Sequence, residues 1–198
     1  MDKTAMFKIS YGLYVLTAKD GDKQNGCIIN TLLQVTDSPL RVSVTVNKNN
    51  YTHDIIAKTG KFNVSMLSEK ASFDTFKHFG FQSGRDVNKF ENYPMPLADN
   101  GIAYVEEGTN SYISAKVFHS VDLGTHTMFI ADVTDAKVLT EDASATYAYY
   151  HAHIKEAPKK ESKGWVCKIC GYVYEGDELP EDFVCPLCKH GAADFEKM

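Results

Sequence analysis

Alternating apolar and polar residues dominate the first 150 positions of the chain. In the segment 41–47, Val42, Val44 and Val46 occupy one face and polar residues the other. An alternation of period two predicts half-buried β-strands. The same pattern predicts strands at 12–17, 62–66, 113–121 and 129–133. Many strands with few helices favour a mainly β barrel, because closing a sheet removes its exposed edges.

Three short helices interrupt this pattern. The first is predicted at 52–59 and is followed by Gly60, which suits a C-terminal cap. Ser68 is a candidate N-cap for a second helix that ends before Gly80, and Ser144 for a third. The apolar residues of these two helices are Phe73, Phe76 and Phe79, and Tyr147, Tyr150 and Ile154.

The composition changes after residue 154. Residues 155–164 are charged and lack large apolar side chains, which is typical of a linker. The segment 165–198 contains four of the five cysteines. We therefore expect a domain at 1–154, a linker at 155–164 and a small second domain at 165–198.

The four clustered cysteines form two C-x-x-C pairs, Cys167/Cys170 and Cys185/Cys188. Each pair lets one tight turn present two thiolates, and two such turns supply a tetrahedral sulfur site for zinc or iron. A segment of 34 residues buries too little surface to fold unaided, so a bound metal would supply the missing stability. The spacing alone leaves zinc and iron open.

The residues around these cysteines closely resemble rubredoxin. The matching segments are Trp165–Tyr174, Leu179–Cys188 and Phe195–Glu196. The resemblance implies one iron ion held by four thiolates, over an aromatic core formed by Trp165, Tyr172, Phe183 and Phe195. The chain departs from the family in two ways, namely a short loop between the pairs and Lys189 in place of the usual glycine. A left-handed turn at Lys189 should cost about 1 kcal/mol.

The first 150 residues resemble the flavin reductase family. The resemblance rests on a series of motifs in the family's order: 11–17, 25–31, 39–40, 44–48, 51–53, 83–90 and 124–133. It implies an FMN-binding split β-barrel that uses NAD(P)H, usually as a homodimer.

The resemblance also implies site residues. Asn30 and Thr31 would line the isoalloxazine edge, with Gln34 nearby. His126 would lie beside the flavin in the nicotinamide site. The FMN phosphate would be held by Asn47, Lys48, Thr52 and His53. Because the chain has no G-x-G-x-x-G fingerprint, NAD(P)H is expected to bind directly over the flavin. The remaining cysteine, Cys27, is interpreted as a small buried residue rather than a reactive thiol.

Charge and hydropathy limit the partners. The net charge is −5, of which three Lys and seven Asp or Glu in 165–198 contribute −4. An acidic tail argues against nucleic acid and fits a protein partner with a positive patch. No apolar run approaches about 18 residues, and no signal-peptide pattern follows Met1, so a cytoplasmic protein without membrane contact is expected.

The order of the two modules resembles the high-molecular-weight rubredoxins. It implies an oxidoreductase that passes electrons from NAD(P)H through FMN to the iron site. The final acceptor implied is a flavodiiron protein that reduces nitric oxide or oxygen. Two alternatives remain at this point. The barrel could release reduced FMN to another enzyme, or a flavin-binding barrel could carry a zinc-ribbon tail for protein recruitment.

Overall fold

The computed structural model describes residues 1–155 and 164–198, in which the chain divides into two compact units, Met1–Lys155 and Glu156–Met198. Residues 156–163, on which most of the predicted linker falls, lie outside the described residues. In the described residues, no helix is long and apolar enough to cross a membrane.

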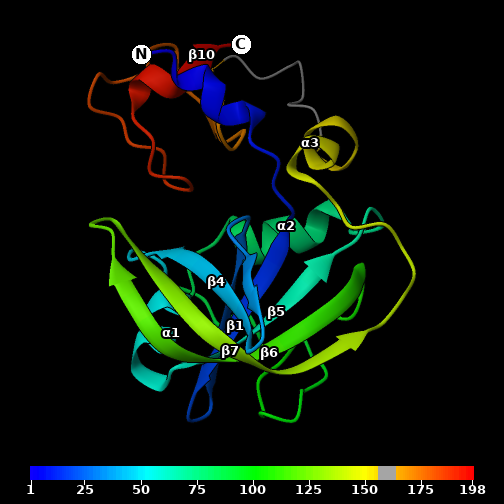
Figure 1. The fold of residues 1–198 in the computed structure, drawn as a ribbon. Helices are drawn as coiled ribbons and strands as arrows, with labels where there is room; N and C mark the ends of the chain where they lie inside the picture. Colours follow the sequence, from blue (N-terminus) through cyan, green and yellow to red (C-terminus); the bar gives the residue numbers. More distant parts are fainter. Residues whose placement is uncertain (156–163) are drawn as a thin grey trace. The chain divides into compact units, whose positions relative to one another are not determined.

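A single seven-stranded antiparallel sheet forms the first unit, in the order β2-β1-β5-β6-β7-β4-β3. Figure 1 shows this sheet curling into a barrel. Strands β2 and β3 are the two ends of the order, so the barrel is split between them. The strands are β1 (Tyr14–Asp20), β2 (Lys23–Ile29), β3 (Leu33–Asp37), β4 (Leu40–Asn47), β5 (Lys61–Leu67), β6 (Thr109–Asp122) and β7 (His126–Val138).

The predicted strands are all present, and the mainly β prediction is confirmed. Val42, Val44 and Val46 are at most 6% exposed and form part of the barrel core. The first strand begins at Tyr14 rather than Gly12, and the turn after it is centred on Gly21. The pattern did not identify β2 or β3 as strands, because the residues of β3 are exposed on both faces and do not alternate in burial.

Two of the three predicted helix starts were wrong. Helix α1 (Tyr51–Thr59) ends at Gly60 as predicted, with φ 67°. Helix α2 (Phe73–Gly80) begins after Ser72, because Ser68 forms an isolated β-bridge with Ser144 and its hydroxyl donates to Gly108. Helix α3 (Tyr147–Tyr149) continues as the π-helix η2 (Tyr150–Ile154), and its cap is the Thr146 hydroxyl, not Ser144.

Helices α1 and α2 pack on opposite faces of β2. Helix α1 packs on β1 and β2 and buries Ile55 and Ile56 in the barrel interior. Helix α2 packs on the other face of β2, where Phe76 and Phe79 join a second cluster with Tyr150. A short 3₁₀-helix, η1 (Lys3–Lys8), precedes the barrel. The core therefore has two layers separated by β1 and β2.

The C-terminal unit is built around a small sheet in the order β10-β8-β9. Its strands are β8 (Trp165–Cys167), β9 (Val173–Tyr174) and β10 (Phe195–Lys197), and a 3₁₀-helix, η3 (Ala192–Asp194), precedes the last. Phe183 packs edge-on against Phe195 and stacks with Tyr172, so the predicted aromatic core is present, with Trp165 against it.

Candidate metal and cofactor sites

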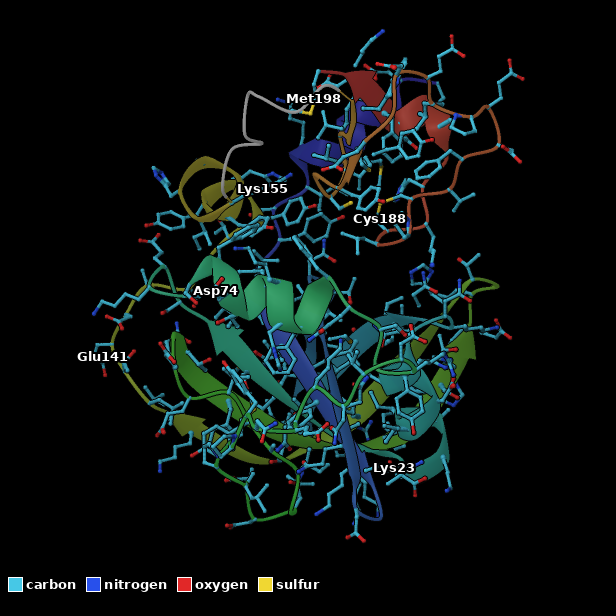
Figure 2. The ribbon with its side chains drawn as sticks, turned by 180° about the vertical axis from the view of Figure 1, so that it is seen from behind. Lys23, Asp74, Glu141, Lys155, Cys188 and Met198 are labelled. Atoms are coloured by element: carbon cyan, nitrogen blue, oxygen red, sulfur yellow. The ribbon has the colours of Figure 1, made fainter. Side chains whose placement is uncertain are left out.

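The four sulfur atoms of the C-terminal unit converge on one point. All of them lie within 4.8 Å of one another. Sγ of Cys167 is 3.6 Å from that of Cys188, and Sγ of Cys170 is 3.5 Å from that of Cys185. Metal–sulfur bonds of about 2.3 Å in a tetrahedron place sulfurs about 3.8 Å apart, so this cage fits a single tetrahedral ion. Figure 2 shows Cys188 within this unit.

Two equivalent turns present the sulfurs. In the first, the N–H of Cys167 bonds the carbonyl of Tyr172, and in the second the N–H of Cys185 bonds that of His190. Each turn needs a left-handed residue, and these are Gly171 (φ 78°) and Lys189 (φ 63°). The left-handed conformation predicted for Lys189 is therefore confirmed.

The environment of the sulfurs favours a bound cation. Burial raises the pKa of the Cys170 thiol to about 12, and burial also raises the pKa of the Cys188 thiol. Burial also raises the pKa of Cys185, but hydrogen bonds from the N–H groups of Cys188 and Leu187 outweigh this effect, so its net pKa is lowered. A bound cation would balance the charge of thiolates at the buried Cys170 and Cys188. Backbone N–H groups of Tyr172, Leu187 and His190 donate to the sulfurs. Such bonds stabilise thiolates and tune the potential of an iron centre.

In the barrel, Asn47 and His126 lie opposite each other in register across β4 and β7. By strand alternation they share the sheet face of Thr45 and Met128, opposite the face of Val46. His126 is half-buried, and its Nδ1 is 2.9 Å from the Thr125 hydroxyl. Both predicted residues thus belong to one polar face at the end of the barrel.

Thr31 extends this polar face. Its hydroxyl donates to the carbonyl of Thr45 at 2.7 Å and accepts from the Thr45 N–H at 3.2 Å. Asn30 is half-buried beside it. Gln34 instead lies exposed on the edge strand β3, where its amide bonds the carbonyl of Thr36. The structure brings Asn30 and Thr31 next to β4, and Gln34 lies further along the edge.

The predicted phosphate residues surround the turn between β4 and α1. Lys48 forms a 2.7 Å ion pair with Asp122 at the tip of β6. Thr52 is fully buried, and its hydroxyl accepts from the amide of Asn25. Thr52 therefore holds the start of α1 against β2 rather than facing solvent. Asn50 caps the helix by accepting from the Thr52 N–H.

His53 is held by bonds at both ring nitrogens. Its Nδ1 lies 3.1 Å from the carboxylate of Asp54, and its Nε2 lies 2.9 Å from the Thr127 hydroxyl. The other carboxylate oxygen of Asp54 accepts from Arg85 at 2.7 Å. Partial burial raises the pKa of Asp54, but the hydrogen bonds from His53 and Arg85 outweigh it, so the net pKa is lowered. Thr127 and His126 point to opposite faces of β7, so His53 and His126 belong to different faces.

Sequence reasoning missed Lys89, the only buried lysine of the described residues. Its ammonium donates to the carbonyls of Gly26 and Phe79, both at 2.8 Å. Burial lowers the pKa of Lys89 to about 8, against a smaller opposing effect of Cys27. Cys27 is buried as predicted, and burial raises the pKa of its thiol. The residues next to Lys89 in the sequence show no apolar periodicity, so nothing local in the sequence predicted that its side chain is buried.

A cavity of about 710 Å³ opens between the start of β2, the start of α1 and the loop 84–90. Cavities of this size hold cofactors and similar ligands. The residues lining it are Asp22, Lys23, Gln24, Tyr51, Gly84, Arg85, Asp86, Val87, Asn88 and Phe90. None of the predicted FMN residues lines it, but Tyr51 directly precedes Thr52 and His53.

The fold and the sulfur cage define a class of protein, namely a flavin-reductase-type barrel joined to a small metal-binding domain. Two family descriptions match the same two parts of the chain. Residues 6–158 match the flavin reductase like domain, and residues 165–196 match the rubrerythrin, rubredoxin-like domain. The chain belongs to the flavin reductase-like family and carries a C-terminal rubredoxin-like domain.

Relatives share one or both parts. The high molecular weight rubredoxin of Moorella thermoacetica is 36% identical, with all of both chains covered. The ferric-chelate reductase (NAD(P)H) of Archaeoglobus fulgidus is 36% identical over 76% of this chain and 89% of its own. The flavin reductase PheA2 superposes with a TM-score of 0.61 at 25% identity, over 74% of this chain and 93% of its own.

These comparisons identify an NAD(P)H-dependent oxidoreductase of the flavin reductase-like family. The family supplies a flavin site in the barrel, and the rubredoxin-like domain supplies four cysteine ligands for one iron ion. Electron transfer is therefore the activity that both parts of the chain serve.

Proposed function

We propose that this protein takes electrons from NAD(P)H at an FMN in the barrel and passes them singly, through an iron ion in the cysteine cage, to a partner protein. The observation that carries the proposal is the presence of both parts in one chain, a flavin reductase-like barrel and a four-sulfur cage. FMN accepts two electrons and releases them one at a time, whereas a tetrathiolate iron takes one at a time. A cage of redox-inert zinc would leave the barrel without this outlet.

The barrel residues hold and orient the cofactor in this proposal. Asn30 and Thr31 lie along the isoalloxazine edge, with Gln34 nearby, and Thr31 uses its backbone because its hydroxyl already bonds Thr45. His126 lies beside the ring and orients the nicotinamide. Asn47 and Lys48, with the start of α1 at Thr52 and His53, form the phosphate end.

The partner is a redox protein in the cytoplasm, and a flavodiiron protein that reduces nitric oxide or oxygen is our specific proposal. Exposed acidic residues support docking to a positively charged protein surface. They gather on the loop of the C-terminal unit at Glu175, Asp177, Glu178, Glu181 and Asp182.

We further propose that the protein is a homodimer. Large apolar side chains are exposed on the edge strand β3, its hairpin with β4 and the end of β6, which is unusual for a monomer surface. They are Leu33 (64%), Val35 (42%), Leu40 (44%), Phe118 (50%), Val121 (37%) and Leu123 (50%).

Anaerobic stopped-flow mixing with NADH or NADPH tests this function. Flavin absorbance should bleach first and the iron–thiolate band second. The Cys185→Ser variant should lose the second phase and keep the first, because Cys185 lies in the C-terminal unit and the flavin site does not. Zinc in protein produced anaerobically with iron would contradict the iron assignment. Release of FMN on reduction would favour the alternative in which the barrel supplies free reduced flavin.

A further inference from the structure

The cavity at the start of β2 has no role in the function proposed above. Its wall includes Tyr51, the first residue of α1, which follows directly on the Asn47–Asn50 turn. Asn47 in turn pairs with His126 across the sheet. Tyr51 is therefore four residues along the chain from Asn47, which lies on the polar face where we place the flavin and the nicotinamide.

Aromatic and polar groups face each other across this cavity. Tyr51 and Phe90 are half-buried in its wall, and the guanidinium of Arg85 lies 5.6 Å from the centre of the Tyr51 ring. Aromatic faces beside a cation suit a flat heteroaromatic base. Gly84 allows the loop to approach closely, since a Cβ there would lie 2.0 Å from the side-chain oxygen of Asn25.

The charges in the cavity suit a phosphorylated ribose. Arg85 uses one of its five N–H donors on Asp54, which leaves others for a ligand. Lys23, at the turn end of the β1–β2 hairpin, is exposed and pairs with no carboxylate in the described residues (Figure 2). Asp22 and Asp86 offer carboxylates of the kind that bond ribose hydroxyls, whereas a cation is needed for a 2′-phosphate.

We propose that this cavity binds the adenosine end of the dinucleotide donor, with Lys23 as the contact for its 2′-phosphate. The adenine lies against the aromatic residues, and Arg85 supports the phosphate side. This inference rests on the proposed NAD(P)H oxidation and adds a preference for NADPH over NADH. Lys23 and the cavity thereby take the place of the dedicated nucleotide-binding motif that the sequence lacks.

Calorimetric titration of the FMN-loaded full chain with 2′,5′-ADP and 5′-AMP tests the cavity without any turnover. We expect 2′,5′-ADP to bind about tenfold more tightly, a difference of about 1.4 kcal/mol. Lys23→Ala should remove this difference by weakening only 2′,5′-ADP. The matched control is Lys61→Ala, an exposed lysine at the start of β5 outside the cavity, and it should change neither affinity. In turnover, Lys23→Ala should raise the KM for NADPH about tenfold relative to the KM for NADH.

Three results would overturn the inference. The two nucleotides could bind equally, Lys23→Ala could behave as Lys61→Ala does, or free FMN could compete with 2′,5′-ADP in flavin-free protein, which would assign the cavity to the flavin. Failure of both NADH and NADPH to reduce the flavin would instead defeat the proposed function. The titration would still decide whether the cavity binds adenosine phosphates.

Discussion

The ammonium group of Lys89 donates to the carbonyl oxygen of Gly26 at 2.8 Å, inside a region that is closed to solvent. A second bond of the same length reaches the carbonyl of Phe79 at the end of α2. One charged side chain thus ties the loop that lines the cavity to both β2 and α2. The ammonium thus gives both carbonyls a charge-assisted hydrogen bond inside the protein.

Replacing Lys89 with Met should destabilise the barrel by about 2–4 kcal/mol, because two buried carbonyls lose a charge-assisted bond. Urea unfolding followed by circular dichroism measures this loss at pH 7. The exposed Lys61→Met variant serves as the control and should change the unfolding free energy by less than about 0.5 kcal/mol. Equal effects of the two substitutions would show that the Lys89 bonds contribute nothing.

The unfolding free energies of the wild type and of Lys89→Met should depend differently on pH. Burial lowers the pKa of Lys89 from 10.5 to about 8 in the folded chain, so between these values the unfolded chain binds more protons. The free energy of unfolding of the wild type should therefore rise with pH across this window relative to Lys89→Met. The rise should be at most about 3 kcal/mol. A constant difference between the two proteins from pH 8 to 10.5 would contradict the lowered pKa.

Asp54→Asn should change which nitrogen of His53 carries the proton. The carboxylate only accepts, so a singly protonated His53 carries its proton on Nδ1 and accepts from Thr127 at Nε2. An asparagine amide can donate to Nδ1 instead and favour the other tautomer. Nitrogen-15 NMR of the histidine rings distinguishes the two forms. Asp74→Asn, on the exposed start of α2, is the control, and an unchanged His53 tautomer in Asp54→Asn would refute the assignment.

Lys189→Gly should stabilise the metal-loaded C-terminal unit by about 1 kcal/mol, because glycine adopts a φ of 63° without steric cost. Guanidinium unfolding followed by the single tryptophan, Trp165, reports on this unit. Gly171→Ala tests the equivalent position of the first turn, where φ is 78°, and should destabilise by a similar amount. The two substitutions should change the unfolding free energy in opposite directions. A change in the same direction would mean that the left-handed backbone strain is not the cause.

Val35→Glu should convert the proposed homodimer to monomers, since it places a charge on the exposed apolar edge strand β3. Sedimentation velocity at micromolar concentration measures the change. Val138→Glu is a matched control at a more exposed valine (67%) at the end of β7 and should leave the mass unchanged. A wild-type protein that sediments as a monomer would remove the basis for the dimer.

The rubredoxin-like half could be predicted almost completely, because its chemistry is local in sequence. Each C-x-x-C pair sets two ligands within one turn, and the aromatic core lies within a few residues of them. Even the strained conformation of Lys189 follows from its place four residues after Cys185. Strands β1, β4, β5, β6 and β7 were predictable for a similar reason, since alternation records which face of each strand is buried. Strand β3 was not, because its residues are exposed on both faces.

Less of the barrel site could be predicted from the sequence. The family motifs predicted that Asn30 and Thr31 line the flavin edge, that Asn47 holds the phosphate and that His126 lies beside the flavin. The fold places Asn47 opposite His126 across β4 and β7, with Thr31 bonded to Thr45 of β4. They could not reveal that Thr52 is buried, or that both nitrogens of His53 already have partners. Those facts depend on Asn25 and Thr127, which come from other strands.

Taken alone, the sequence determined the two-part organisation, the strands of the barrel other than β2 and β3, and the four-sulfur cage, because each depends on residues close together in the chain. The tertiary structure alone decided the burial of Lys89, the chain of bonds from Arg85 to Thr127, and the cavity beside Lys23. Each of these joins segments that are dozens of residues apart. Only the register and curvature of the sheet fix which distant side chains meet, and periodicity carries no record of that.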